Sequence, residues 1–131
     1  MNGHNVEYSM VNSKYIVMPH HSNPTGLLFG GVLMSWIDIA AAMVAEKHSG
    51  KDVATVQIEQ INFASPIMVG EHVSLHAALI GTGNSSMRIK VTVSSENVKT
   101  CQVNKSTEVT LTFVAIDEKK KPTAVPPLLP S

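Results

Sequence analysis

The sequence predicts an α+β fold in which a curved antiparallel sheet wraps around one long central helix. The first observation is that residues 32–46 contain neither glycine nor proline and are rich in Leu, Met and Ala, which favours a helix. The second is that the segments after it are extended, and apolar residues alternate with polar ones along most of them. These four predicted strands cover residues 53–63, 72–79, 87–93 and 109–115.

The predicted helix is the unusual element, because Asp38 is the only ionisable residue between Val32 and Ala45. A surface helix carries an apolar stripe and a charged face, so a helix that is apolar nearly all round is expected to be buried under the sheet. Gly50 is expected to end it, since glycine is favoured just past a helix C-terminus. A curved sheet of this kind leaves its edge strands open, and open edges favour pairing with a second copy as a homodimer.

Two less regular segments flank these elements. Residues 15–18 predict a short strand before Pro19, and residues 20–31 predict an ordered loop, because they are rich in His, Ser, Asn, Pro and Gly. Residues 119–131 contain three lysines and four of the seven prolines, which predicts a flexible tail. The predicted organisation is therefore one domain at residues 1–118 followed by that tail.

The composition limits the class of protein. The chain has 131 residues, 44% of them hydrophobic, which is enough for one globular domain. The formal net charge is zero, which argues against nucleic-acid binding and against an anionic-membrane binder. No apolar run approaches the roughly 18 residues of a membrane span. Cys101 is the single cysteine, so no intrachain disulfide can form, and a cytoplasmic protein is expected.

A carboxylate and a glycine pair in the predicted helix form the candidate catalytic site. Asp38 lies among apolar neighbours and is either a catalytic base or nucleophile, or a structural residue held by the backbone of a neighbouring strand. Gly30 and Gly31 stand at the helix start, where free N–H groups and the positive dipole end could polarise a carbonyl. The alternative for the glycine pair is a tight turn.

The spacing of these groups predicts that two subunits share one site. Asp38 follows the glycines by seven or eight residues, so it lies roughly 10–12 Å further along the helix axis. That distance is too long for Asp38 to reach a carbonyl held at the start of its own helix. If both groups serve one reaction, two helices must lie side by side at a dimer interface.

Other polar residues of the loop have competing interpretations. Asn23 could orient a water molecule or bind a carbonyl oxygen, or it could simply form a turn before Pro24. His20 and His21 could be general bases or metal ligands, but no Cys/His spacing of a zinc site is present, so exposed loop histidines are favoured. No metal site is predicted.

The loop and helix start at residues 19–38 read Pro-His-His-Ser-Asn-Pro-Thr-Gly-Leu-Leu-Phe-Gly-Gly-Val-Leu-Met-Ser-Trp-Ile-Asp. This segment resembles one enzyme family, the acyl-CoA thioesterases of the hotdog fold, in particular the broad-range bacterial short-chain and cytosolic acyl-CoA hydrolases. The resemblance continues through residues 61–71, 83–87 and 112–115, and covers about residues 8–117. It implies a helix wrapped by a five- or six-stranded antiparallel sheet, and hydrolysis of acyl-CoA to a free acid and CoA.

The resemblance also implies roles for particular residues. Asp38 of one subunit would act with Asn23 of the other, while the backbone N–H of Gly31 or Gly30 polarises the carbonyl. The residues implied to hold the CoA phosphates are Asn84, Ser85, Ser86, Arg88 and Lys90. No cofactor is implied beyond the coenzyme A of the substrate, and the expected homodimer assembles further, to a tetramer or hexamer. The chain departs from its relatives at Pro24 and at the histidine pair.

Some alternatives stay open from sequence alone. Asp38 could activate water as a general base or attack the thioester to form a mixed anhydride. A hydratase or dehydratase on the same fold would use a histidine such as His21 with an acidic residue. A non-catalytic acyl-CoA-binding or sensor protein is the remaining alternative.

Overall fold

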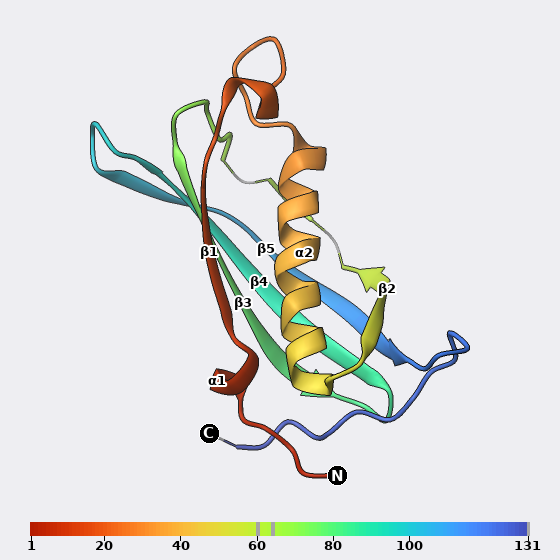
Figure 1. The fold of residues 1–131 in the computed structure, drawn as a ribbon. Helices are drawn as coiled ribbons and strands as arrows, with labels where there is room; N and C mark the ends of the chain where they lie inside the picture. Colours follow the sequence, from red (N-terminus) through yellow and green to blue (C-terminus); the bar gives the residue numbers. More distant parts are fainter. Residues whose placement is uncertain (60, 64, 131) are drawn as a thin grey trace.

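The fold is one sheet curled around one long helix, as the ribbon in Figure 1 shows. The structure is a computed structural model that describes residues 1–59, 61–63 and 65–130. Its elements in chain order are α1 (Val6–Ser9), β1 (Val11–Ile16), η1 (Pro19–His21), α2 (Gly30–Ser49), β2 (Asp52–Ile58), β3 (His72–Thr82), β4 (Ser86–Asn97) and β5 (Gln102–Ile116). The predicted fold class is confirmed, although the first strand begins at Val11 rather than at residue 15.

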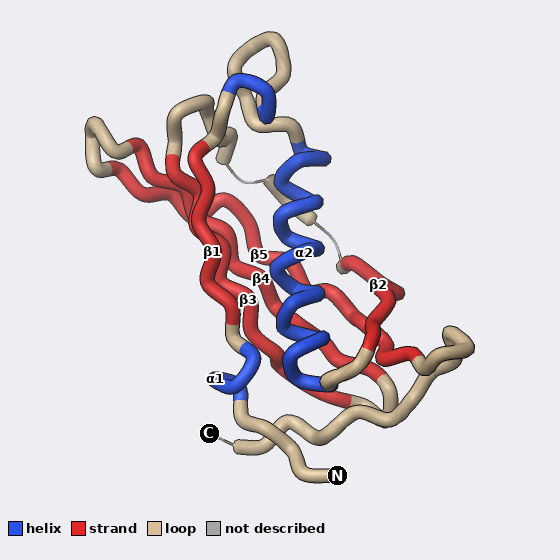
Figure 2. The backbone as a smooth tube through the Cα atoms, in the orientation of Figure 1, coloured by secondary structure: helices blue, strands red, loops and turns tan. Residues whose placement is uncertain are grey.

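The sheet has five strands in the order β1-β3-β4-β5-β2, and every neighbouring pair is antiparallel. The strands curve past one face of α2, so that β1 and β2 stand on opposite sides of the helix (Figure 2). Both of these strands are edges of the sheet within one chain. β2 pairs with β5 along one side, and a bulge between Thr55 and Gln57 interrupts this pairing.

The core lies between α2 and the inner face of β3, β4 and β5. Alternate residues of those strands point toward the helix, as the period of two predicts. The residues that α2 buries are Leu33, Trp36, Ile37, Ala40, Ala41, Val44, Ala45, His48 and Ser49. Gly50 ends the helix in the left-handed conformation, with φ of 67°, and its N–H donates to the Glu46 carbonyl at 2.8 Å.

The expectation that the sheet covers α2 all round is wrong for a single chain. Gly31, Ser35, Ile39 and Met43 follow one another at intervals of four residues, and all four are exposed, Ile39 by 52% and Met43 by 42%. The strip they form is named here the open strip of α2. The sheet curls around the other sides of the helix only, which the sequence pattern could not distinguish from full enclosure. The open strip is available to a second copy of the chain.

The C-terminal segment that the composition predicts to be a flexible tail packs against the domain in the structure. Residues 122–130 run across the lower ends of the strands and of α2 (Figure 1). The Val125 N–H donates to the Asn84 carbonyl at 2.8 Å, and the Val125 side chain is only 7% exposed. The buried His48 ring hydrogen-bonds through Nε2 to the Pro126 carbonyl at 2.7 Å. The tail therefore closes the lower end of the core and belongs to the domain.

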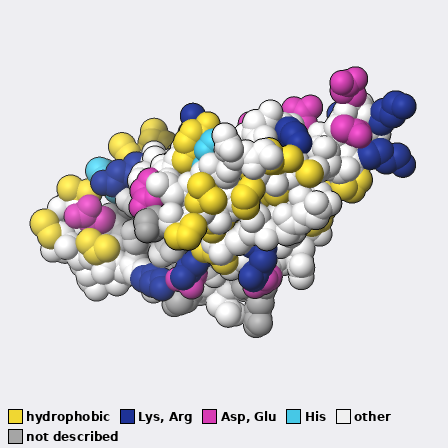
Figure 3. Space-filling model, turned by 90° about the horizontal axis from the view of Figure 1, so that it is seen from below, with side chains coloured by type: hydrophobic (Ala, Val, Ile, Leu, Met, Phe, Trp, Pro, Cys, Tyr) yellow, Lys and Arg dark blue, Asp and Glu magenta, His cyan; other side chains and the backbone are white. Residues whose placement is uncertain are grey.

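The surface agrees with the neutral charge balance. Seen from below, hydrophobic side chains lie among polar atoms, and acidic and basic side chains lie close to one another at a projecting corner, along the lower edge and on the left (Figure 3). Mixed charges of this kind do not build the concentrated basic face that nucleic-acid binding needs. No helix in the described part of the chain has the length and apolarity needed to cross a membrane.

Candidate active site

The candidate site begins with the loop between η1 and α2, which Asn23 organises. The Asn23 side-chain Oδ1 accepts hydrogen bonds from the Thr25 N–H at 2.9 Å, the Thr25 hydroxyl at 2.7 Å and the Leu27 N–H at 3.1 Å. Gly26 has φ of 83°, a left-handed conformation that favours glycine. The interpretation of Asn23 as a turn former is therefore correct for its oxygen.

The Nδ2 amide of Asn23 is oriented as a hydrogen-bond donor for a ligand. Among the described residues, none accepts a hydrogen bond from its Nδ2 amide, and the residue is only half-buried. An amide whose oxygen is fixed by three donors holds its N–H₂ group in one orientation. Asn23 is thus a fixed donor beside the start of α2, which suits a carbonyl oxygen or a water molecule.

The first amides of α2 lie at the open end of the helix, and the described part of the chain offers the first two no acceptor. The Val32 and Leu33 N–H groups both donate to the Phe29 carbonyl, at 3.1 and 3.2 Å. Within the described residues no acceptor is recorded for the N–H groups of Gly30 and Gly31, and both glycines are exposed. A Cβ added to Gly31 would meet nothing within 4 Å. The helix start therefore offers free donors, a positive dipole end and open space for a ligand.

Asp38 lies further along α2 and is held by β2. The Thr55 hydroxyl donates to Asp38 Oδ1 at 2.9 Å. Asp38 is half-buried, and this bond leaves its second carboxylate oxygen, Oδ2, available. The structural alternative, a carboxylate held by the backbone of a strand, is not what the structure shows, because a hydroxyl makes the contact.

Thr55 is the site residue that the sequence interpretation missed. The residue stands at the bulge of β2, where one strand gains a residue relative to its partner and side chains are re-aimed. A hydroxyl next to a lone carboxylate is a hydrogen-bond donor that the carboxylate needs. The signal could not be found from the sequence, because nothing along the chain shows that residue 55 lies opposite residue 38.

The distance between Asp38 and the glycine pair follows from the unbroken helix. α2 is continuous from Gly30 to Ser49, so seven residues separate Asp38 from Gly31 by about 10 Å along the axis. A carbonyl bound at the Gly31 N–H lies beyond the reach of the same chain's Asp38. One chain therefore places Asp38 and the glycine amides too far apart to act on one carbonyl.

The two adjacent histidines of the loop pack against each other, and one of them packs against α2. His20 and His21 have their ring centroids 4.1 Å apart, and His21 packs edge-on against Trp36 at 5.0 Å. Partial burial, and then the neighbouring His20, lower the pKa of His21 below its usual value. In the described part of the chain, no three His, Cys, Asp or Glu side chains gather as a metal site would require.

A small apolar cavity of about 190 Å³ adjoins the start of α2. It is lined by Leu27, Leu28, Gly30, Phe63, Ser65, Pro66, Ile67 and Ser106. The sequence gives no separate signal for it, because its walls come from the loop, from the segment before β3 and from β5. Apolar walls beside free backbone donors suit a ligand with a polar carbonyl attached to a hydrocarbon group.

The residues predicted to hold CoA phosphates lie elsewhere in the chain. The turn at Asn84, Ser85 and Ser86 is at the lower end of the sheet, where the tail covers it, whereas the loop and the start of α2 are at the upper end (Figure 1). In one chain the turn therefore lies at the opposite end of the sheet from the glycine pair, and its role in holding the CoA phosphates stays a prediction. The turn signal in the sequence located a hairpin, but not the end of the sheet at which it lies.

The two predicted phosphate-binding cations are engaged in ion pairs. Arg88 lies 2.9 Å from Glu59, and Lys90 lies 3.3 Å from Glu108, on the outer face of the sheet. Hydrogen bonds from Lys105 and from Lys90 hold the pKa of Glu108 below its usual value. Exposed pairs of this kind contribute only about 0–1 kcal/mol, so they are easily exchanged for another anion.

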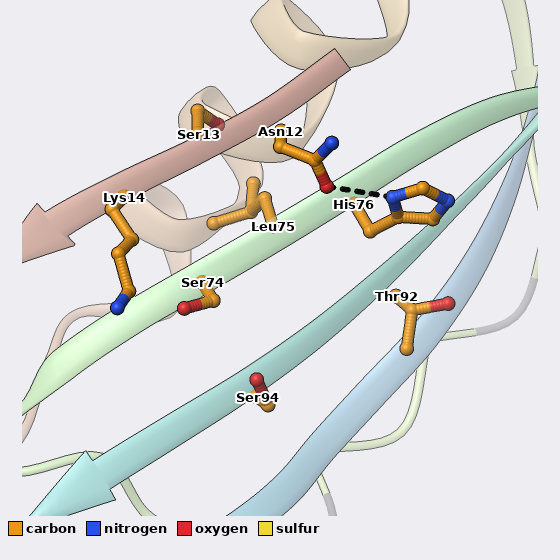
Figure 4. Close-up of a pocket in the computed structure, with 8 residues that line it drawn as sticks. All are labelled: Asn12, Ser13, Lys14, Ser74, Leu75, His76, Thr92 and Ser94. Atoms are coloured by element: carbon orange, nitrogen blue, oxygen red, sulfur yellow. Dashed lines mark hydrogen bonds between the residues drawn. The ribbon is translucent and has the colours of Figure 1, made fainter. Parts of the chain in front are cut away.

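A second cavity, of about 370 Å³, lies on the face of the sheet turned away from α2. Figure 4 shows its polar side chains on β1, β3 and β4, with His76 hydrogen-bonded to Asn12 through a 2.7 Å contact. His76 is exposed, as the alternating pattern of its strand predicts. This cavity has no carboxylate and no free helix terminus, so it is separate from the candidate site.

The fold and the site together define the class of protein. An antiparallel sheet curled around one helix, with a lone carboxylate and free amides on that helix, is the arrangement of a hotdog-fold hydrolase. The profile of the Thioesterase superfamily matches residues 25–102. The chain belongs to this superfamily, and the predicted family is confirmed.

Individual relatives agree with this assignment. An uncharacterized acyl-CoA thioester hydrolase of Zymomonas mobilis is 39% identical over 115 residues, covering 88% of this chain and 77% of that protein. The acyl-CoA thioester hydrolase YciA of Escherichia coli is 33% identical over 126 residues, covering 94% of this chain and 96% of that protein.

Solved structures have the same fold. A structure of an apo-hexameric acyl-CoA thioesterase superimposes with a TM-score of 0.95 at 36% identity, covering 100% of this chain and 84% of that one. An acyl-CoA hydrolase from Staphylococcus aureus, solved with butyryl coenzyme A and coenzyme A, gives a TM-score of 0.90 at 32% identity, covering 97% and 77%. Structures of that enzyme also exist with an aspartate, a threonine or an asparagine replaced by alanine.

Proposed function

We propose that this protein hydrolyses acyl-CoA thioesters to a free carboxylic acid and CoA, at a site shared between two subunits. The observation that carries the proposal is the position of the Asp38 carboxylate on α2, the helix whose start presents the Gly30 and Gly31 amides. Thr55 of β2 holds this carboxylate by a hydrogen bond. The names of the similar enzymes, acyl-CoA thioester hydrolases, support the substrate class. No metal or cofactor is part of the proposed reaction.

The proposed roles follow from the geometry. The thioester carbonyl oxygen accepts a hydrogen bond from the Gly31 or Gly30 N–H at the positive end of α2, which stabilises the negative charge that develops on it. The Nδ2 amide of Asn23 is the second donor, directed at the same oxygen or at the attacking water. Asp38 comes from the partner subunit, since the Asp38 of the same chain is about 10 Å away.

Asp38 can act by either of two routes. As a general base, the carboxylate takes a proton from water, the hydroxide oxygen bonds to the carbonyl carbon, the carbon–sulfur bond breaks, and the proton passes to the CoA sulfur. As a nucleophile, the carboxylate itself displaces the CoA thiolate to form a mixed anhydride, which water then hydrolyses. A single turnover in ¹⁸O-labelled water distinguishes the general-base route from an anhydride that water cleaves at the Asp38 carboxyl carbon. The label enters the acid product in the first case and the Asp38 carboxylate in the second.

The open strip of α2 and the edge strand β2 are the proposed dimer surface. Val56 of β2 is 58% exposed, and Ile39 and Met43 of the open strip are also exposed. Apolar residues exposed on a helix and on an adjacent edge strand favour burial against a second copy. The hexameric assembly of similar thioesterases supports further association of such dimers.

The acyl group is proposed to occupy the cavity beside Gly30. Its volume of about 190 Å³ is below the roughly 300–1,000 Å³ of pockets that hold drug-sized ligands, which favours short acyl chains. Arg88 and Lys90 of a neighbouring subunit remain candidates for the CoA phosphates, after exchange of their exposed ion pairs. The single cysteine is consistent with a cytoplasmic location, which forms part of the proposal.

The test is a thioesterase assay with acyl-CoA substrates of increasing chain length. The expected result is hydrolysis that is fastest for short chains and falls by orders of magnitude in Asp38→Asn, with an unchanged circular dichroism spectrum. CoA binding without hydrolysis at any chain length would favour the binding or sensor alternative. Hydration of an enoyl-CoA, lost in His21→Ala, would favour the hydratase alternative.

A further inference from the structure

We propose that His21 is a positioning residue whose neutral imidazole clamps the Asn23 loop onto α2, and that protonation of this ring releases the loop and lowers turnover. His21 itself touches no proposed reacting group. The effect on turnover depends on the proposed function, whereas the release of the loop does not.

The backbone of His21 joins the two ends of the loop. Its N–H donates to the Met18 carbonyl at 2.9 Å, before the loop begins. Its carbonyl accepts from the Phe29 N–H at 3.0 Å, immediately before α2. Asn23 lies between these two contacts, so the position of its amide depends on how firmly His21 is held.

The imidazole ring makes the third contact and fixes the loop in a particular protonation state. The Met18 N–H donates to His21 Nδ1 at 3.0 Å, so Nδ1 is an acceptor and the ring is neutral, with its proton on Nε2. Protonation at Nδ1 would place its N–H against the Met18 N–H, so that two hydrogen-bond donors face each other. The ring would then turn away, and the contact with Met18 would be lost.

The ring also anchors the loop to the core through a single tryptophan. His21 packs edge-on against Trp36 of α2 at 5.0 Å, and Trp36 stacks on Tyr15 of β1 at 4.2 Å with an interplanar angle of 2°. Trp36 is buried. A ring wedged between the loop and such a stack cannot change its orientation without moving the loop.

The groups around His21 determine the direction of the pH effect. η1 contributes His20, whose ring centroid lies 4.1 Å away and whose coulombic effect opposes protonation of His21. α2 contributes Trp36, which packs on His21, and β1 contributes Tyr15, which stacks on Trp36. Burial and His20 lower the pKa of His21.

The sign follows from linkage. A histidine whose pKa is lower in the folded than in the unfolded state adds no stability at neutral pH, where it is uncharged in both. As the pH falls below the ordinary value of about 6.5, the unfolded state gains the proton first, and stability declines until the folded-state pKa is passed. The clamp is therefore intact above about pH 6.5 and opens in the acid range below it.

The experiment uses Trp36, the single tryptophan of the chain, as a probe beside His21. Tryptophan fluorescence and kcat are recorded from pH 8 to pH 5 on the full-length enzyme. Three proteins are compared, namely the wild type, His21→Asn and the control His20→Asn. Asparagine at position 21 places Oδ1 where it can accept the Met18 N–H, but it does not titrate.

The wild type is expected to show a fluorescence transition below about pH 6.5 with a kcat decline of the same midpoint. His21→Asn should keep kcat at pH 8 within about twofold and lose the fluorescence transition, while His20→Asn should move both midpoints to higher pH. A transition that persists unchanged in His21→Asn, or fluorescence that is flat in the wild type, overturns the proposal. Fluorescence that behaves as expected in a protein without thioesterase activity would contradict the proposed function alone.

Discussion

At the scale of single residues, the candidate site depends on hydrogen bonds that orient the side chains of Asp38 and Asn23. Among the described residues Asp38 has one hydrogen-bond donor, Thr55. The Asn23 side-chain oxygen accepts hydrogen bonds from the loop, which orients the amide group of the same side chain. Fixed orientation of this kind is worth more to a reaction than to stability, because a small misplacement of a reacting group costs rate steeply. The residues that orient Asp38 and Asn23 are therefore as testable as the reacting groups.

Thr55→Val tests the orientation of the carboxylate. Valine keeps the shape of threonine and removes the hydroxyl, so Asp38 loses its donor and can rotate. We expect kcat to fall roughly 10- to 100-fold with a smaller change in KM, measured with a short acyl-CoA. Thr92→Val, on the opposite face of the sheet, is the matched control and should stay near the wild-type value. Equal effects of the two substitutions would remove Thr55 from the site.

At the scale of elements, the start of α2 combines weak helix formers with free donors. Glycine is a poor helix residue by up to about 1 kcal/mol relative to alanine. Neither Gly30 nor Gly31 has a positive φ, so the backbone conformation does not require glycine. A residue type that costs stability without a conformational reason indicates that the space beside it is used.

Gly31→Ala separates stability from activity. The added Cβ meets nothing within 4 Å, so the protein should be as stable as the wild type or more stable by up to about 1 kcal/mol. The same methyl group occupies the space through which a carbonyl approaches the amide, and kcat/KM should fall on the order of tenfold. Thermal unfolding and steady-state kinetics on one preparation check both. Unchanged kcat/KM would contradict the proposed carbonyl site.

The elements themselves were largely predictable from the sequence. The periods of α2 and of β3, β4 and β5 reflect burial on one face, which local alternation records directly. Asp38 was identified because a carboxylate is unusual in an apolar helix, whereas Asn23 received its role only from the family resemblance. Thr55 and the cavity beside Gly30 were not found, since they exist only where distant segments meet. The open strip was missed because a dimer-covered helix and a core helix have the same pattern.

At the scale of the whole molecule, the C-terminal tail completes the core. Its lysine and proline content suggested disorder, but Val125 fills the lower end of the core and the Pro126 carbonyl accepts the His48 ring N–H. Val125→Ala should lower the free energy of unfolding by about 1–2 kcal/mol, measured by denaturation at fixed protein concentration. Leu129→Ala, at an exposed position of the same tail, should have little effect. Equal effects would mean that the tail does not contribute to the core.

The proposed sharing of the site between subunits is the property of the whole assembly. Asp38→Asn removes the carboxylate from one half-site, and Asn23→Ala removes the amide from the other. In a mixed dimer of the two variants, one site combines the intact Asp38 of one chain with the intact Asn23 of the other, while the second site carries both substitutions. The intact composite site should work even though neither variant is active alone.

The measurement is complementation after the two inactive variants are unfolded together and refolded. Random pairing makes half of the dimers mixed, and each mixed dimer has one intact site of two, so activity should return to about a quarter of the wild-type value. Each variant refolded alone is the control and should remain inactive. A site built within one chain predicts no recovery, because every chain in the mixture then lacks either its Asp38 or its Asn23. Recovery thus distinguishes a shared from a single-chain site without any structure of the dimer.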